Sequence, residues 1–98
     1  MIKVMLERKV KKENYSKLME YVRDIRAAAL HQPGYITGET LVRGEDPISV
    51  LVISTWVSED HWKYWTTNEC RIELDDIANR LLEEEPKVTI YKVPLEED

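Results

Sequence analysis

The apolar segment Ile48-Ser49-Val50-Leu51-Val52-Ile53 constrains the fold of this chain more than any other feature. It follows the turn residues Gly44 to Pro47, and we expect it to form a strand over Ile48–Trp56. Successive side chains of a strand point to opposite faces of a sheet. A strand that is apolar at nearly every position therefore needs cover on both faces.

The residues before this strand predict a strand, a helix and a second strand. Residues 2–10 alternate in polarity, and the charged Arg8 lies on the face that is otherwise apolar. From about Lys12 to His31 the apolar period becomes helical. Pro33-Gly34 then ends the helix and opens a strand over Tyr35–Arg43, which the turn at 44–47 joins to the next strand as an antiparallel hairpin.

The residues after Trp56 predict a helical segment and a last strand. Ser58 can cap a segment that runs from residue 58 to about residue 84. Three poor helix formers at 66–68 predict a break in this segment, and Asn68 can cap the second piece. Pro86 then opens a strand through Val88, Ile90 and Val93.

The order of these elements predicts a single α+β domain over residues 1–98, with an acidic tail at about 94–98. The order β-α-β-β-α-β is that of the ferredoxin-like fold, a four-stranded antiparallel sheet with helices on one face. The other face would be bare, so we expect a homodimer in which two sheets pair about a twofold axis. We expect this paired surface to be rich in aliphatic side chains and poor in charge.

Composition excludes several classes of partner and cofactor. The formal net charge of −5 gives no broad positive field for nucleic acid or anionic lipid. No apolar run is long enough to span a bilayer. Cys70 is the single cysteine, which predicts a reducing, cytoplasmic location and no disulfide. We expect no bound metal and no flavin, because the chain has no Cys/His cluster and no phosphate-binding glycine loop.

Four segments together resemble the antibiotic biosynthesis monooxygenase-like family. They are Pro33-Gly34-Tyr35, Gly38-Glu39-Thr40-Leu41, the strand end Ser54-Thr55-Trp56, and the helix from Trp62 to Trp65. The resemblance covers nearly the whole chain. It implies a dimeric α+β barrel, and a pocket between sheet and helices in which members oxygenate phenols and quinols without a cofactor.

The family that the chain resembles also includes members that degrade heme, and the residues of this chain disfavour that activity. Those members use an asparagine on the first strand, a tryptophan on the second helix and a histidine on the third. Trp65 matches the tryptophan, but the first strand offers Glu7 and Arg8, and no histidine follows His61. Asp75 lies near the expected ligand position, and a carboxylate is a poor replacement for the imidazole that usually ligates heme iron.

Five residues are candidates for a site. Trp62 and Trp65 lie three positions apart, so they can form an aromatic wall, or they can simply pack in the core. Arg8 needs an anion on its apolar face, either a substrate phenolate or carboxylate, or a carboxylate of the chain such as Asp75. His61 is a candidate base.

Two more polar residues have simpler explanations. Glu73 is a second carboxylate with which Arg8 can pair. Cys70 lies near a helix N-terminus but is expected to act as a small apolar filler.

Two functions remain open. The first is a cofactor-independent monooxygenase acting on a small phenol or quinol, with Trp62 and Trp65 as the wall, Arg8 as the anion partner and His61 as the base. The second is a non-enzymatic dimer that binds a small ligand or supplies an interaction surface. An open cavity with Arg8 unpaired would favour the enzyme, and a closed interface would favour the binding module.

Overall fold

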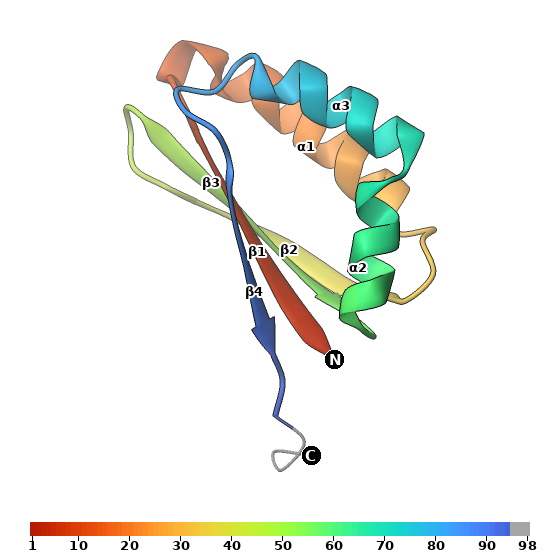
Figure 1. Cartoon of the computed structure of the whole chain (residues 1–98). Coiled ribbons are helices and arrows are strands. Elements are labelled where there is room, and N and C mark those ends of the chain that lie inside the picture. Colours follow the sequence, from red (N-terminus) through yellow and green to blue (C-terminus); the bar gives the residue numbers. More distant parts are fainter. Residues whose placement is uncertain (95–98) are drawn as a thin grey trace.

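The structure, a computed structural model, describes residues 1–94 and contains a four-stranded antiparallel sheet with helices on one face (Figure 1). The strands are β1 (Ile2–Val10), β2 (Tyr35–Arg43), β3 (Ile48–Trp56) and β4 (Lys87–Lys92), in the spatial order β2-β3-β1-β4. The helices are α1 (Tyr15–Ala29), α2 (Glu59–Thr66) and α3 (Glu69–Asn79). The predicted ferredoxin-like α+β fold is confirmed.

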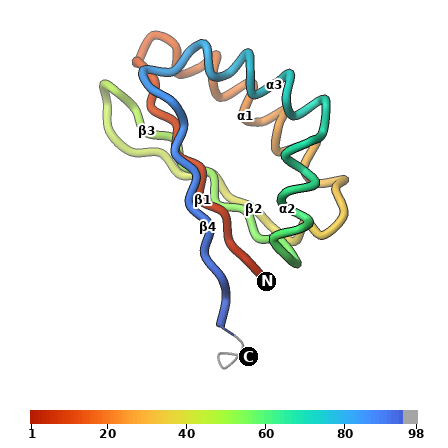
Figure 2. The backbone as a smooth tube through the Cα atoms, viewed as in Figure 1, coloured from red at the N-terminus to blue at the C-terminus, as the bar shows by residue number. Residues whose placement is uncertain are grey.

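The helices form one layer over the sheet. α1 and α3 lie side by side across it, and α2 covers the end where β3 finishes (Figure 1). The backbone trace shows that β4 runs beside β1 and ends on the side of the N-terminus (Figure 2). There the Val93 N–H donates to the carbonyl of Met1 at 3.0 Å. Among residues 1–94, no helix is long and apolar enough to cross a membrane.

The predicted break in the second helical segment is confirmed, and its predicted end is wrong. Ser58 caps α2 by accepting the His61 N–H, and Asn68 caps α3 by accepting the Arg71 N–H. α3 ends at Asn79 rather than near residue 84. The chain turns there because its next residues bind β1, where the Glu83 N–H donates to the Lys9 carbonyl at 3.0 Å.

The core lies between the helices and the sheet in two clusters separated by Arg8. One cluster gathers around the aromatic side chains and contains Ile2, Val4, Leu6, Ala29, Trp56, Trp62 and Trp65. The other lies toward the opposite end of the sheet and contains Val10, Leu18, Val22, Ile48, Val50 and Ala78. Arg8 follows Leu6 and precedes Val10 on the same face of β1, so its guanidinium enters the helix–sheet layer where the clusters meet.

The opposite face of the sheet carries no helix and is more charged than predicted. Residues paired across antiparallel strands share a face, so the register places Met5, Leu41, Leu51 and Ile53 together on it. The same alternation adds six charged side chains around this apolar centre, namely Lys3, Glu7, Lys9, Glu39, Arg43 and Lys87. The expectation of a surface poor in charge is therefore wrong.

The predicted acidic tail lies outside the described residues apart from Pro94.

Candidate active site

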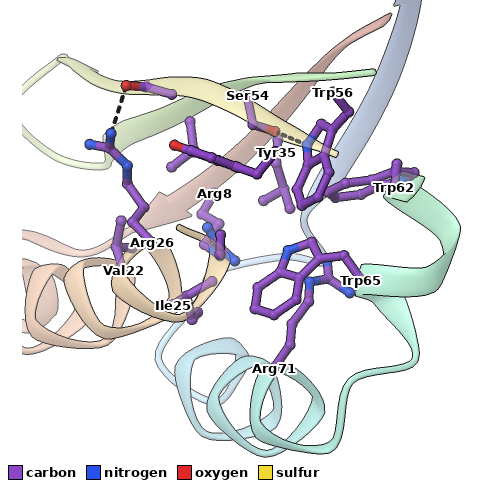
Figure 3. A pocket seen from close by; sticks show the side chains of 14 residues that line it. Arg8, Val22, Ile25, Arg26, Tyr35, Ser54, Trp56, Trp62, Trp65 and Arg71 are labelled. Atoms are coloured by element: carbon purple, nitrogen blue, oxygen red, sulfur yellow. Dashed lines mark hydrogen bonds between the residues drawn. The ribbon is translucent and has the colours of Figure 1, made fainter. Parts of the chain in front are cut away.

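A small cavity of about 40 Å³ lies between α1, the sheet and the α2–α3 corner (Figure 3). Its lining is mainly aromatic and aliphatic, with three arginines: Leu6, Arg8, Val22, Ile25, Arg26, Ala29, Tyr35, Gly38, Val52, Ser54, Trp56, Trp62, Trp65 and Arg71. All three tryptophans of the chain line it. A cavity of this size holds water molecules, so an aromatic ring can enter only if lining side chains move.

The aromatic wall is centred on Trp56, which sequence reasoning placed only at a strand end. Trp56 is fully buried, and its ring meets Trp62 edge-on at 5.8 Å and stacks with Trp65 at 6.4 Å between centroids. Tyr35 meets the same ring edge-on at 5.4 Å. The Trp56 indole N–H donates to Ser54 Oγ at 2.9 Å, so its polar edge is satisfied inside the site. Trp62 and Trp65 are both core residues and cavity walls.

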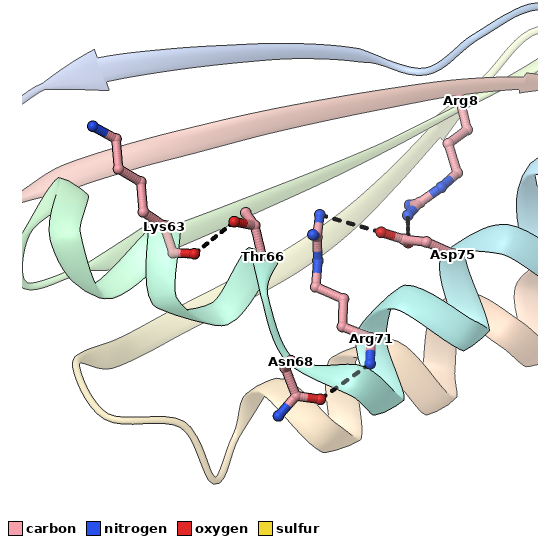
Figure 4. Close-up of polar contacts among 6 residues, drawn as sticks. All are labelled: Arg8, Lys63, Thr66, Asn68, Arg71 and Asp75. Carbon is pink, nitrogen blue, oxygen red and sulfur yellow. Dashed lines mark hydrogen bonds and ion pairs between the residues drawn. The ribbon is translucent and has the colours of Figure 1, made fainter.

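Asp75 joins two arginines beside this wall (Figure 4). Its Oδ1 accepts a hydrogen bond from Arg8 Nη2 at 3.0 Å, and its Oδ2 forms an ion pair with Arg71 Nη2 at 3.3 Å. The Arg71 guanidinium also stacks over Trp62, 5.0 Å from the ring centroid. The expected pairing of Arg8 with a carboxylate of the chain is confirmed, and the partner is Asp75. Because Asp75 is occupied by two guanidiniums, it is poorly placed to serve as an iron ligand.

Burial shapes the charges of this network. Desolvation lowers the pKa of the Arg8 guanidinium from its ordinary value, and the charge of Asp75 opposes this shift. Desolvation also lowers the pKa of Arg71, again against the effect of Asp75. Both arginines are thus held as buried cations by one shared carboxylate.

Arg26 is a site residue that sequence reasoning missed. It lies on α1 next to the apolar stripe, and its guanidinium reaches β2, where it donates to the Gly38 carbonyl at 2.6 Å and to the Thr40 hydroxyl at 3.1 Å. A long arginine side chain can cross from the edge of a helix to a neighbouring strand while its stem packs on apolar groups. The only signal in the sequence was its position directly after Ile25.

His61 does not line the cavity, so its position gives no support to a role as base. Its ring lies against the turn at Gly34, where an added Cβ would collide with the ring, and its Nδ1 is 2.7 Å from Ser58 Oγ. Glu7 also points away, since it faces the helix-free side and accepts the Ser49 hydroxyl at 2.6 Å. This hydrogen bond lowers the pKa of the Glu7 carboxyl.

Two further candidates lie outside the site. The expectation of Cys70 as an apolar filler is wrong, because Cys70 is exposed. Glu73 is exposed and takes no part in the Arg8 network, because it lies on the solvent side of α3. In the part of the chain that the structure describes, no three His, Cys, Asp or Glu side chains gather in a group able to hold a metal ion.

Comparison with known proteins identifies the family. The family model described as antibiotic biosynthesis monooxygenase matches residues 1–70, which is most of the chain. The chain belongs to this family. The resemblance seen in the sequence is thereby confirmed, and the matched region includes β1, α1, the hairpin and both tryptophans of α2. No curated protein sequence matches the chain.

Solved structures share the fold of this chain at low sequence identity. A conserved protein from Methanosarcina mazei has a TM-score of 0.86 at 20% identity, with 93% of this chain and 90% of that chain covered. An antibiotic biosynthesis monooxygenase has a TM-score of 0.86 at 17% identity, with 96% and 99% covered. SnoaB, a cofactor-independent oxygenase from Streptomyces nogalater, has a TM-score of 0.76 at 14% identity, with 95% and 91% covered.

Proposed function

We propose that this member of the antibiotic biosynthesis monooxygenase family is a cofactor-independent monooxygenase that acts on a small phenol or quinol. The observation that carries this proposal is the cavity itself, whose walls are Tyr35 and all three tryptophans and whose polar groups are mainly guanidiniums. Flat aromatic walls suit a flat ring, and cations suit the phenolate form of such a ring. The family membership and the fold shared with the oxygenase SnoaB add support.

The proposed reaction needs only the substrate and dioxygen. A phenolate is electron-rich enough to reduce dioxygen, and a new carbon–oxygen bond then forms at a ring carbon. One oxygen atom stays on that carbon as a carbonyl, and the other leaves as water with the hydrogen of that carbon and the proton of the hydroxyl. Phenol plus dioxygen thus gives quinone plus water, and the protein need only bind, desolvate and stabilise the anion.

Each part of the site has a proposed role in this reaction. Trp62 and Trp65, with Trp56 behind them, hold the ring and exclude water. Arg8 stabilises the phenolate, and Asp75 positions Arg8 through the 3.0 Å hydrogen bond. His61 has no part, because its ring lies outside the cavity.

A ligand-binding module without catalysis is the second candidate, and two observations favour it. The cavity is small, at about 40 Å³, and Arg8 already has a carboxylate partner. A closed interface between sheet and helices was the feature expected of such a module. Oxygen uptake separates the two functions, since only the enzyme consumes dioxygen.

The test is oxygen uptake with hydroquinones and naphthols in the presence of a metal chelator. We expect uptake that depends on the protein and on the substrate, together with a quinone product. Arg8→Lys keeps the charge but loses the planar guanidinium whose Nη2 donates to Asp75, so kcat/KM should fall at least about ten-fold.

Arg80→Lys makes the same chemical change at an exposed arginine of the α3 end and is the matched control. It should leave kcat/KM unchanged. If no phenol or quinol raises oxygen uptake above the rate without protein, the proposed oxygenase is refuted.

We further propose a homodimer formed through the helix-free face of the sheet. Leu51 and Ile53 stay half-buried there without any helix above them, and Met5 and Leu41 extend the same apolar centre. Sedimentation equilibrium should give twice 11.6 kDa, or 23.2 kDa, and the value should persist on dilution. Leu51→Lys would place a charge in the apolar centre of this face, so it should shift the mass toward the monomer. A folded monomer of the unmodified chain would refute the dimeric barrel.

We also propose a reducing, cytoplasmic location, which the single thiol of Cys70 fits.

A further inference from the structure

The arginines of the cavity carry more positive charge than the protein neutralises. Arg8, Arg26 and Arg71 line the cavity, and no carboxylate is among the lining residues in the described part of the chain. Asp75, behind Arg8 and Arg71, supplies one negative charge, and Arg26 makes no ion pair among residues 1–94. The site therefore holds a net charge of +2 within a chain of net charge −5. Arg8 and Arg71 are buried and Arg26 is half-buried, and surplus positive charge held away from water is costly unless an anion compensates it.

Two N–H donors of the arginines that line this cavity are also unused. Arg8 Nε and Arg26 Nε are buried, and neither has a hydrogen-bond partner among the described residues. Arg8 is only 3% exposed, so its Nε–H has no route to bulk water. A buried charged donor without an acceptor is expensive, and such groups are normally satisfied. These donors are available to a ligand that brings acceptor oxygens.

We propose that the cavity, widened by movement of its lining side chains, takes an aromatic acid, that is, a ring carrying a carboxylate, and that the substrate of the reaction proposed above is a phenolic acid. The substrate assignment rests on the proposed function, but the binding of an aromatic acid does not. A carboxylate has two coplanar acceptor oxygens that match guanidinium donors, and it is already ionised at neutral pH. A phenol ionises near pH 10 in water, so it enters neutral unless the site removes its proton.

The charge balance fits a phenolic acid better than a simple phenol. The carboxylate compensates one of the two surplus charges. The remaining positive charge favours loss of the phenol proton, and the phenolate that forms compensates the second charge. A simple phenolate would leave one guanidinium charge without a partner in the cavity.

The side on which such a ligand enters follows from the exposure of the lining residues. The half-buried ones lie on α1, β2 and β3, including Ile25, Arg26, Tyr35 and Gly38, whereas the α2 and α3 residues Trp62, Trp65 and Arg71 are buried. The cavity is therefore closest to solvent between α1 and β2. Arg26 crosses this side to reach the Gly38 carbonyl (Figure 3). It therefore stands where an entering carboxylate would first meet the protein.

The test compares 2-naphthoate with its neutral isostere 2-naphthamide by isothermal titration calorimetry near neutral pH. The two probes share ring and shape and differ in charge. We expect the acid to bind at least about ten-fold more tightly, because charged hydrogen bonds are the stronger ones. We also expect added salt to weaken the acid far more than the amide. Equal binding of the two, tighter binding of the amide, or no binding of either at millimolar concentration would overturn the proposal.

Arg26→Gln tests the residue assignment, because glutamine can keep a hydrogen bond to β2 but carries no charge. The preference for acid over amide should fall several-fold, because the acid loses more affinity than the amide when the charge is removed. Arg23→Gln removes the same charge from an exposed position of α1 outside the cavity, and it should keep the full preference. If both variants lose the preference equally, the effect comes from overall charge and the assignment to the cavity is wrong.

The outcomes separate this inference from the proposed function. Selective binding of 2-naphthoate together with no oxygen uptake on phenols, quinols or phenolic acids would refute the oxygenase and keep the acid-binding site. Turnover of neutral naphthols without any preference for the acid would keep the oxygenase and refute the inference.

Discussion

Replacing Asp75 with alanine should lower the free energy of unfolding by about 3–5 kcal/mol, the usual cost of removing one partner of a buried ion pair. Asp75 is the shared counter-charge of Arg8 and Arg71, whose side chains are only 3% and 11% exposed. Without it, both guanidiniums would remain in the core with no compensating charge. Urea unfolding of the variant and the unmodified protein, at one protein concentration, measures the difference.

Asp76→Ala is the matched control, one residue further along α3. Asp76 pairs with Arg80 at 2.8 Å, but the two side chains are 66% and 72% exposed, so the loss should be below about 1 kcal/mol. The double variant Asp75→Ala with Arg8→Met should recover part of the lost stability, because it removes one of the stranded charges. If Asp75→Ala costs no more than Asp76→Ala, the network is not the buried pair that its geometry indicates.

Trp65→Ala should also lower the free energy of unfolding by about 3–5 kcal/mol, the usual cost of deleting a buried large aromatic side chain. Trp65 is 2% exposed, stacks with Trp56 and carries the Arg71 guanidinium 5.8 Å from its ring centroid. The cavity beside Trp65 is small, so most of its ring packs against other side chains and loses these contacts in the variant. Urea unfolding at a fixed protein concentration gives the value.

Tyr64→Ala is the control for this variant, because it deletes the neighbouring aromatic side chain on the solvent side of α2. Tyr64 is 62% exposed, so its loss should change stability by less than about 0.5 kcal/mol. A near-zero cost for Trp65→Ala would show that the ring lines the pocket without supporting the core. It would then weaken ligand binding with no effect on folding.

Helix boundaries show how local signals and long-range contacts share the fold. The break at residues 66–68 was predictable because its cause is local, namely poor helix formers followed by the Asn68 cap. The end of α3 was not, because residues 82 and 83 bind β1, more than seventy positions away. The apolar residues at 81 and 82 continue the helical pattern in the sequence. The helix itself ends earlier because the chain there pairs with Val10 and Lys9 of β1.

Some residues of the candidate site could likewise be predicted from local sequence patterns, and others could not. The position of Arg8 on an apolar strand face and the spacing of Trp62 and Trp65 follow from the strand and helix periods, so the sequence indicated all three. Trp56, Arg26 and Arg71 come from a strand end, a helix edge and a helix start, where no period marks a side chain as part of a site. Their meeting around one cavity depends on how the helices pack over the sheet.

The sequence alone therefore determined the order of elements, the face on which Arg8 lies and the family, because alternation, helical period and capping act between near neighbours. Only the tertiary structure decided that Asp75 and not Glu73 neutralises Arg8, that His61 turns toward Gly34, and that three arginines share one cavity. These outcomes depend on distances between side chains far apart in the chain. Such distances are fixed when the helices pack on the sheet, and no local pattern records them.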